Sequence, residues 1–356
     1  MRRFILLAAA ASCALVAAAS ARAVVTPPFQ VVMSGLDNPR GLTFAPNGAL
    51  YVAEAGRGGP QPCVLGPEGG AFIGLTGGIS RLWRGVQERV ADGLPSRAGP
   101  GGVAATGPHD IAMLGRGGAH FSIGLGADPA TRALCPPISP MLGWLARLPG
   151  SGNWRLETDL AAYEAAANPD GGLPDSNPYG LLAQPGATLA TDAGGNSLLR
   201  VGANGAITTL AVFPSRPQGR FTDAVPTTVA LGPDGAYYVG ELTGAPFVPG
   251  QANIYRVVPG SPPTIYRSGF SFVIDITFGA DGSLYVLQFA NGPGLSGPGE
   301  LWRVAPDGTR TLVVTGLIAP GGVAIGPDGA FYISNCSIFP GTGPFPCNGQ
   351  VVRVAP

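Results

Sequence analysis

His109 and Asp110 form the one adjacent ionisable pair of this sequence that suits proton transfer near neutral pH. An imidazole beside a carboxylate can act as a general base whose ring the carboxylate orients. Neighbouring residues of a β-strand point to opposite faces, so the competing interpretation is a structural histidine bonded to backbone. His120 is expected to pack or to lie at an interface. Ser122 and the other serines lack a nucleophile-elbow context, and lysine is absent, so neither a Ser-His-Asp hydrolase nor Schiff-base or P-loop chemistry is predicted.

Oxygen-bearing side chains recur where apolar segments of the sequence end, a pattern that suits Ca²⁺, which takes about six to eight oxygen ligands. The candidate ligands are Glu54, Asp110, Asp192, Glu241, Asp275, Gln288 and Asn335. The same residues suit a second role, in which they cap strand ends or pair with Arg40 or channel water, because buried polar groups must be hydrogen-bonded. Calcium is therefore a hypothesis. The segment "NPDGGLPDSN" from Asn168 fits turn chemistry better than a calcium loop.

One repeated unit must position these side chains. It consists of an apolar strand, a tight turn, a strand of the type "LYV" that ends in a polar residue, a variable loop and a strand ending near "RV". The copies begin at Asn38, Gly107, Asn177, Val225, Phe272 and Ala319. The later copies start about 47 residues apart, which is typical of four-stranded propeller blades. Turn pairs such as Asp234-Gly235 favour hairpins within each copy.

The repeat predicts an all-β fold, a six-bladed β-propeller that forms a single domain over residues 24–356. A charged fraction of 12%, with 57 Gly and 37 Pro, suits such a turn-rich domain better than a helical one. The last copy lacks a fourth strand, and "FQVVMSGL" before the first copy is expected to supply it and close the ring. One helix is expected from Leu156 to Ala167. An open β-sandwich is the alternative, but sandwiches do not show this regular copy number.

In such a blade the start of the first strand and the end of the second strand share one mouth of the central channel. The inner positions at this mouth are Arg40, His109, Tyr179, Thr227, Ile274 and Gly321, of which Arg40, Tyr179 and Thr227 are the predicted ligand-binding residues. The long insertions fall at the same mouth, at roughly 57–77, 127–141, 168–176, 243–252, 290–299 and 336–349. Rigid scaffolds commonly carry function on such loops, so this mouth is the predicted functional face.

Four cysteines lie in these insertions, an even number that favours disulfides in an exported chain. Cys336 and Cys347 flank a Pro/Gly-rich segment and are expected to pair with each other. Cys63 is expected to pair with Cys135. A zinc site is not predicted, because the spacings match no zinc pattern and the sequence has only two histidines.

Residues 1–23 have the pattern of a signal peptide, with Arg2 and Arg3 before an apolar run and Ala21-Arg22-Ala23 at its end. Cleavage after Ala23 would leave a secreted or periplasmic protein without a membrane anchor. The formal net charge is zero, so no basic footprint indicates nucleic acid or an acidic membrane as a partner. A monomer is expected.

The chain after residue 23 resembles the ScyD/ScyE family, named for scytonemin biosynthesis and related to NHL-type propellers. The resemblance rests on "SGLDNPRGLTFAPNGALYVAEAGRGG", "GPHDIA", "IGLGADPA", "DSNPYGLL", "TDAGGNSLLRV", "AVPTTVALGPDGAYYVGELTGAPF" and "GTGPF". It implies an exported six-bladed propeller, linked in some members to assembly of an extracellular pigment and in most members without an assigned activity. It implies no catalytic residues.

Two classes of function fit these observations. The first is an extracytoplasmic binding or scaffold protein that recognises a small molecule or a protein partner at the loop-rich mouth. The second is an enzyme at the same mouth, either a metal-assisted hydrolase like the lactonase propellers or an oxidoreductase acting on an aromatic metabolite. Propellers host both classes, so the predicted fold does not decide between them.

Overall fold

The structure is a computed structural model that describes residues 29–66, 72–115, 118–150, 153–217 and 221–355. The predicted signal peptide lies outside the described residues. Within the described ranges, no helix has the length and apolar character needed to cross a membrane.

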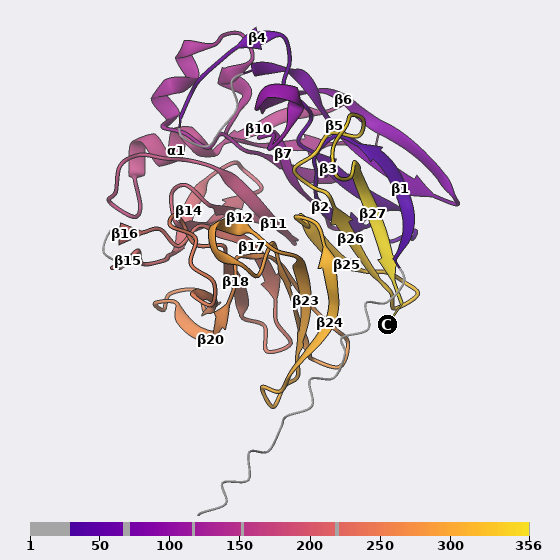
Figure 1. The fold of residues 1–356 in the computed structure, drawn as a ribbon. Coiled ribbons are helices and arrows are strands. Elements are labelled where there is room, and N and C mark those ends of the chain that lie inside the picture. The colour runs from indigo at the N-terminus through magenta and orange to yellow at the C-terminus, as the bar shows by residue number, and fades with distance from the viewer. Residues whose placement is uncertain (1–28, 67–71, 116–117, 151–152, 218–220, 356) are drawn as a thin grey trace, which may run out of the picture.

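Six antiparallel sheets form a ring, which confirms the predicted six-bladed β-propeller (Figure 1). The first strands, which contact one another around the channel, are β2 (Pro39–Phe44), β7 (Pro108–Met113), β11 (Pro178–Gln184), β17 (Pro226–Leu231), β21 (Val273–Phe278) and β25 (Gly322–Ile325). They define blades 1 to 6 in this order. The second strands are β3 (Leu50–Glu54), β8 (Ala119–Ile123), β12 (Ala187–Asp192), β18 (Tyr237–Glu241), β22 (Leu284–Gln288) and β26 (Phe331–Asn335).

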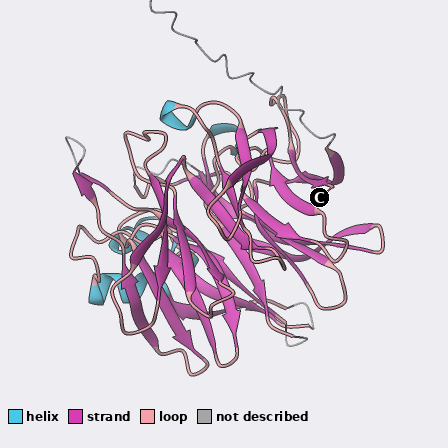
Figure 2. Cartoon of the chain, turned by 90° about the horizontal axis from the view of Figure 1, so that it is seen from below, coloured by secondary structure: helices cyan, strands magenta, loops and turns pink. Residues whose placement is uncertain are grey.

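The outer half of each blade completes the sheet. The third strands are β5 (Phe72–Trp83), β9 (Trp144–Leu148), β13 (Ser197–Gly202), β19 (Ala252–Val257), β23 (Gly299–Val304) and β27 (Gly349–Val354). The fourth strands are β6 (Val86–Ala98), β10 (Arg155–Asp159), β14 (Ile207–Val212), β20 (Thr264–Phe270), β24 (Arg310–Leu317) and, in blade 6, β1 (Gln30–Leu36). Figure 2 shows that strands make up most of the chain.

The two ends of the described chain close the ring together. Strand β1 pairs antiparallel with β27, with Val31 opposite Val352 and Leu36 opposite Gly349 (Figure 1). The predicted closure by the segment before the first repeat is therefore confirmed. Pairing strands from both termini in one sheet leaves no open gap in the ring, because every blade then has a neighbour on each side.

The hydrophobic core lies between neighbouring blades rather than at one centre. Six buried clusters each join two adjacent blades. Leu287 and Leu301 of blade 5, for example, belong to the same cluster as Ile333 and Val352 of blade 6. Alternation along each strand sends apolar side chains to both faces of a blade, because each face meets another blade.

Tight turns join the first and second strands at the end of the channel that we call the turn face. Glycines at these turns have positive φ, as at Gly235 (78°) and Gly282 (75°), which explains the predicted Asp-Gly pairs. The turn aspartates pair with arginines of the third strand, as Asp281 does with Arg303 at 2.8 Å. These short connections leave little room for a binding site in the regular blades.

One predicted element is corrected. The helix expected from Leu156 to Ala167 is shorter, because residues Arg155–Asp159 form β10, the fourth strand of blade 2, and α1 runs only over Leu160–Ala167. Asp159 ends the strand and caps the helix, since its carboxylate accepts the N–H of Ala162 at 2.9 Å. The first insertion is also shorter than predicted, because β5 begins at Phe72.

The remaining elements decorate the opposite end of the channel, which we call the loop mouth. They are β4 (Gln61–Pro62), β15 (Arg216–Pro217), β16 (Phe221–Thr222) and the 3₁₀ turns η1 (Pro100–Gly102), η2 (Pro129–Leu134), η3 (Ser139–Met141) and η4 (Pro293–Leu295). Disulfides join Cys63 to Cys135 and Cys336 to Cys347, so both predicted pairs are confirmed. The first disulfide links the insertions of blades 1 and 2 inside a buried cluster.

Candidate functional site

The predicted ring of residues comes together at the loop mouth. His109, Tyr179, Thr227, Ile274 and Gly321 line one narrow stretch of the channel. Arg40 lies close enough to His109 for its charge to act on the imidazole. The same stretch is lined one residue deeper by Gly41, Asp110, Gly180 and Asp275. The repeat register therefore places all three predicted ligand-binding residues at one end of one channel.

A local irregularity in the strands aims these side chains. The pairing of first and second strands shifts register between Pro39 and Leu42 in blade 1, between Pro108 and Asp110 in blade 2, and at the corresponding place in blades 3, 4 and 5. Such bulges bend a strand and redirect a side chain, and they are frequent beside functional sites. Each shift falls at the inner ring position.

His109 is buried and bonded to the next blade. Its Nδ1 lies 3.1 Å from the carbonyl oxygen of Pro178, which can only accept, so Nδ1 carries the proton and Nε2 the lone pair. Its ring lies 4.5 Å from the ring of Tyr179. Burial, and then the charge of Arg40, lower the pKa of His109 to about 3. The bond to backbone fits the structural interpretation, and the neutral imidazole keeps a lone pair on Nε2 that can accept a hydrogen bond.

The imidazole accounts for the glycine that follows the second strand of blade 2. The repeat suggested Gly124 as the residue that closes this strand, but Ile123 pairs with Pro108 as Glu54 pairs with Pro39, so Ile123 holds that position and Gly124 follows it. A Cβ at Gly124 would lie 2.1 Å from Cε1 of His109, so a larger residue would displace the ring. His109 and Gly124 are therefore sterically coupled, which the sequence pattern did not reveal.

Arg40 and Thr227 differ in how fully they are bonded. Thr227 donates its hydroxyl to the carbonyl oxygen of Val273 at 2.7 Å, which fastens blade 4 to blade 5. Arg40 donates from Nη2 to the carbonyl oxygen of Ala105 at 2.7 Å, whereas its buried Nε has no hydrogen-bond partner. Arg40 forms no ion pair with a carboxylate among the described residues. It is thus the less satisfied of the two.

Asp110 and Asp275 occupy equivalent positions in blades 2 and 5 and tie each blade to the next. Asp110 accepts the N–H of Leu181 at 2.7 Å, and Asp275 accepts the N–H of Val323 at 2.8 Å. Burial raises the pKa of Asp275 to about 6. Burial, and then the charge of Asp275, raise the pKa of Asp110 well above its ordinary value. Repulsion between the two carboxylates therefore opposes their ionisation together.

Four of the predicted calcium ligands instead cap the loops of their own blades. Each accepts a backbone N–H from the residue that leads into the first strand. Glu54 accepts from Asp37 at 2.6 Å, Asp192 from Asn177 at 2.6 Å, Gln288 from Ser271 at 2.8 Å and Asn335 from Ile318 at 2.7 Å. This is the capping role that the sequence left open as the second interpretation.

Glu241 in blade 4 also caps locally, since it accepts the N–H of Asn253 at 2.6 Å and forms an ion pair with Arg216. In the ranges that the structure describes, no three His, Cys, Asp or Glu side chains converge as metal ligands would. The seven predicted oxygen ligands do not fit a shared calcium ion, because five serve separate blades and Asp110 and Asp275 accept N–H bonds. Calcium stays a prediction that this geometry does not favour.

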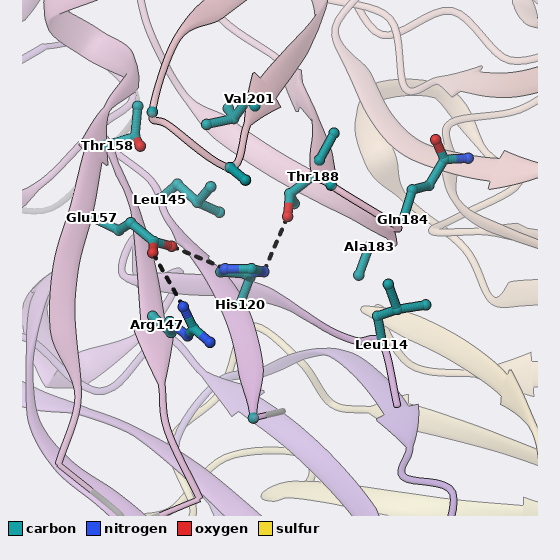
Figure 3. A pocket seen from close by; sticks show the side chains of 16 residues that line it. Leu114, His120, Leu145, Arg147, Glu157, Thr158, Ala183, Gln184, Thr188 and Val201 are labelled. Atoms are coloured by element: carbon teal, nitrogen blue, oxygen red, sulfur yellow. Dashed lines mark hydrogen bonds and ion pairs between the residues drawn. The ribbon is translucent and has the colours of Figure 1, made fainter. Parts of the chain in front are cut away.

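A second constellation lies at the turn face, between blades 2 and 3 (Figure 3). His120 contacts the carboxylate of Glu157 with Nε2 at 2.9 Å and the hydroxyl of Thr188 with Nδ1 at 3.0 Å. Arg147 lies 3.7 Å from the same carboxylate. From the sequence, His120 is expected to pack or to lie at an interface, at the leucine position of the "LYV" strand. Its pairing with Arg147 shows instead that it stands at the tyrosine position.

The sequence carried a signal for this site. Tyrosine pairs with a third-strand arginine in blades 1, 4, 5 and 6, as Tyr238 does with Arg256. In blade 2 the tyrosine is replaced by His120. A break in the repeat at a titratable residue was therefore visible. Glu157 and Thr188 had no such signal, because they come from other strands.

The comparisons with known proteins show the fold. The sequence matches no family model, and no curated protein matches it. A catalytically inactive virginiamycin B lyase from Staphylococcus aureus is 17% identical over 86% of this chain and 82% of its own, with a TM-score of 0.51. A gluconolactonase from Xanthomonas campestris is 11% identical over 92% and 89%, with a TM-score of 0.55.

A third similar structure, described as an oxidoreductase (glucose dehydrogenase) from Thermus thermophilus, is 18% identical over 92% of this chain and 99% of its own, with a TM-score of 0.55. These structural neighbours are six-bladed propellers. At such identities the likeness shows the architecture alone. The chain is a six-bladed β-propeller protein with two disulfides.

Proposed function

We propose that this protein is an exported propeller of the ScyD/ScyE type that binds a small molecule bearing a carboxylate or similar oxyanion at the loop mouth. One observation carries the proposal. The guanidinium of Arg40 is buried at the mouth, pairs with no described carboxylate, and leaves Nε without an acceptor. An unsatisfied buried donor costs about 1–3 kcal/mol, more for a charged group, and an incoming oxyanion would remove that cost.

The surroundings of Arg40 support a small ligand. His109 beside it is neutral and lies against Tyr179, so this wall of the mouth is aromatic and uncharged. The insertions around the mouth are held by both disulfides, which fits a preorganised rather than a collapsing site. Disulfides also fit an oxidising compartment, in agreement with the proposed export.

The test uses benzoate as the probe and benzamide as its neutral counterpart. Isothermal titration and thermal shift should show binding of benzoate, at least tenfold weaker binding of benzamide, and loss of benzoate binding in Arg40→Met. The matched control is Arg57→Met, because Arg57 is exposed on an insertion at the same mouth. Equal binding of both probes, or unchanged binding in Arg40→Met, would overturn the oxyanion site.

The alternative is an enzyme at the same mouth, lactonase-like or an oxidoreductase. The neutral imidazole of His109 and the carboxyl pair of Asp110 and Asp275 favour it, because perturbed pKa values cluster at catalytic sites. Similar structures named as a lactonase, a lyase and an oxidoreductase agree with it. Gluconolactone turnover that His109→Asn abolishes would favour the enzyme over a binding protein.

A bound metal is tested separately. Elemental analysis of the purified protein, with melting curves in the presence and absence of a chelator, decides the calcium hypothesis. Stoichiometric calcium and a chelator-dependent Tm would support it. If the purified protein contains no metal and the chelator does not change its Tm, the calcium hypothesis is wrong and only side chains bind the ligand.

A further inference from the structure

A second cavity opens at the turn face, at the opposite end of the blades from the loop mouth. It measures about 230 Å³ and lies between the ends of the first strands and the starts of the second strands in blades 2 and 3. Its walls include Leu114, Leu145, Ala183 and Val201, and its polar side chains include His120, Glu157 and Thr188 (Figure 3). An apolar cavity with a few convergent polar groups is the usual form of a small-molecule site.

The hydrogen bonds fix the tautomer of His120. The carboxylate of Glu157 only accepts, so Nε2 of His120 carries the proton that this bond needs. Nδ1 then carries the lone pair, and the hydroxyl of Thr188, 3.0 Å away, donates to it. A hydroxyl donates to an imidazole, and the imidazole donates to a carboxylate. Both distances lie within the range of about 2.6–3.2 Å expected for an activated nucleophile and its base.

We propose that this cavity is an active site for small neutral esters, in which Thr188 is the nucleophile, His120 its general base and Glu157 the carboxylate that orients the imidazole. Such a triad is recognised by the roles of its members rather than by fold or sequence position. The three residues come from β12, β8 and β10, so two blades assemble the site. The inference does not depend on the proposed function of the loop mouth.

The chemistry balances without any further reactant than water. The Oγ1 of Thr188 attacks the ester carbonyl carbon as its proton passes to Nδ1 of His120. The tetrahedral intermediate collapses, the bond from carbon to the leaving oxygen breaks, and the alcohol departs with the proton from Nδ1. Water then attacks the acyl-threonine and gives a proton to Nδ1. That proton returns to Oγ1 of Thr188 as the acid leaves.

The lining defines the class of substrate. Its volume and aliphatic walls suit a short acyl chain, and the cation beside the triad is Arg147, which lies 3.7 Å from the carboxylate of Glu157. Thr188 is only 3% exposed, so the hydroxyl is reached from the cavity rather than from bulk water. Esters with large acyl groups should therefore react poorly.

The regular blades show why the cavity occurs here. In blade 4, Tyr238 stands at the position of His120, and its hydroxyl donates to the turn aspartate Asp234 at 3.2 Å. That ring packs with Tyr266 and Phe278, so this position belongs to a filled core layer. In blade 2 the shorter imidazole turns to Glu157 and Thr188 instead.

The charges around His120 set the expected pH dependence. Burial lowers the pKa of His120 below 6.5, opposed by Glu157 and reinforced by Arg147 and then Arg155. These groups come from β9 and β10, and blade 3 contributes the uncharged Thr188. Ester hydrolysis should rise as pH increases through a pKa below 6.5, because only neutral His120 accepts the proton.

Covalent labelling gives the most direct test. Diethyl p-nitrophenyl phosphate should release p-nitrophenol and leave a diethylphosphoryl group on Thr188, detected by peptide mass spectrometry. Thr188→Ser should be labelled, and His120→Asn should be labelled at least tenfold more slowly. A label on another residue, or none on the wild-type protein, would overturn the proposal.

Hydrolysis of p-nitrophenyl acetate provides the kinetic test. Thr188→Val, which keeps the shape and removes the hydroxyl, and His120→Asn should each lower kcat/KM at least tenfold, since general-base catalysis contributes about 10²–10⁴. Thr208→Val is the matched control, because Thr208 is exposed on β14 of the same blade. Arg57→Met, an exposed position at the loop mouth, should also leave the rate unchanged. Wild-type hydrolysis no faster than that of Thr188→Val, with both melting alike, would contradict the site.

Discussion

Carboxylates at the two ends of the propeller have pKa values shifted in opposite directions. At the loop mouth, burial raises the pKa of Asp275 to about 6, and burial together with neighbouring carboxylates raises the pKa of Asp175 to about 6. At the turn face, the hydrogen bond from Arg303 lowers the pKa of Asp281 to about 2. The same residue type therefore carries a costly charge at one end and a stabilised charge at the other.

The difference teaches what each end contributes. The turn face repeats one arrangement, in which an exposed turn aspartate pairs with an arginine of the third strand. At the loop mouth, carboxylates recur at similar positions of the blades but have different partners. Some cap loops, some bridge neighbouring blades and some lie beside one another. Strongly perturbed groups cluster at functional sites, which supports the proposal of ligand binding at the mouth.

The largest effect should come from removing a buried mouth carboxylate. Glu54→Ala leaves the N–H of Asp37, the hydroxyl of Ser80 and the guanidinium of Arg89 without their common acceptor. Breaking such a buried pair costs about 3–5 kcal/mol of unfolding free energy, measured by chemical denaturation. The control Glu88→Ala, whose partner Arg81 lies near the surface, should cost less than about 1 kcal/mol. Equal losses of unfolding free energy in the two variants would show that carboxylates at the two ends contribute equally to stability.

Disulfide removal should come next. Replacing Cys63 and Cys135 by serine should cost about 4 kcal/mol, and replacing Cys336 and Cys347 about 3 kcal/mol, because the first pair closes 72 residues and the second 11. Hydrogen exchange should then increase in the mouth insertions and stay unchanged in the tight turns. Faster exchange at the turn face would show that the two ends are not independent.

Glu164→Gln should sharpen the contrast through pH. Burial, and then the carboxylates of Asp192, Asp170 and Asp175, raise the pKa of Glu164 to about 8. A raised folded pKa means that this group's stabilisation is full below about pH 4.5 and is lost as pH rises through about 8. The variant should therefore have the same Tm as the wild type at pH 5 and a Tm a few degrees higher at pH 9. A difference in Tm that does not depend on pH would contradict the raised pKa of Glu164 as its cause.

The smallest effect should come from the turn face. Asp281→Asn removes the ion pair with Arg303, but both side chains are well exposed, so Tm at pH 7 should fall by less than about 2 °C. The lowered pKa of Asp281 gives stability that is present above about pH 4 and lost as pH falls through about 2. Wild type and variant should thus converge near pH 2. A large loss of Tm at pH 7 would show that the pair of Asp281 and Arg303 contributes strongly to stability.

Much of the fold was predictable because the blade is a local unit. Turn pairs such as Asp281-Gly282, apolar strands and the missing last strand gave six blades, the closure by Gln30–Leu36 and both disulfides. The helix was predicted too long because the residues before it alternate as a strand and pair with β9. Local patterns do not show which of two competing elements finds a partner.

The candidate sites divide in the same way. The sequence by itself determined that Arg40, His109 and Tyr179 share one mouth, because the repeat sets the register of every blade. Only the tertiary structure decided that five predicted calcium ligands cap separate loops, that Arg40 is left with an unpartnered Nε, and that His120 meets Glu157 and Thr188. Hydrogen bonds between blades depend on side-chain direction and bulges, which a period in the sequence does not encode.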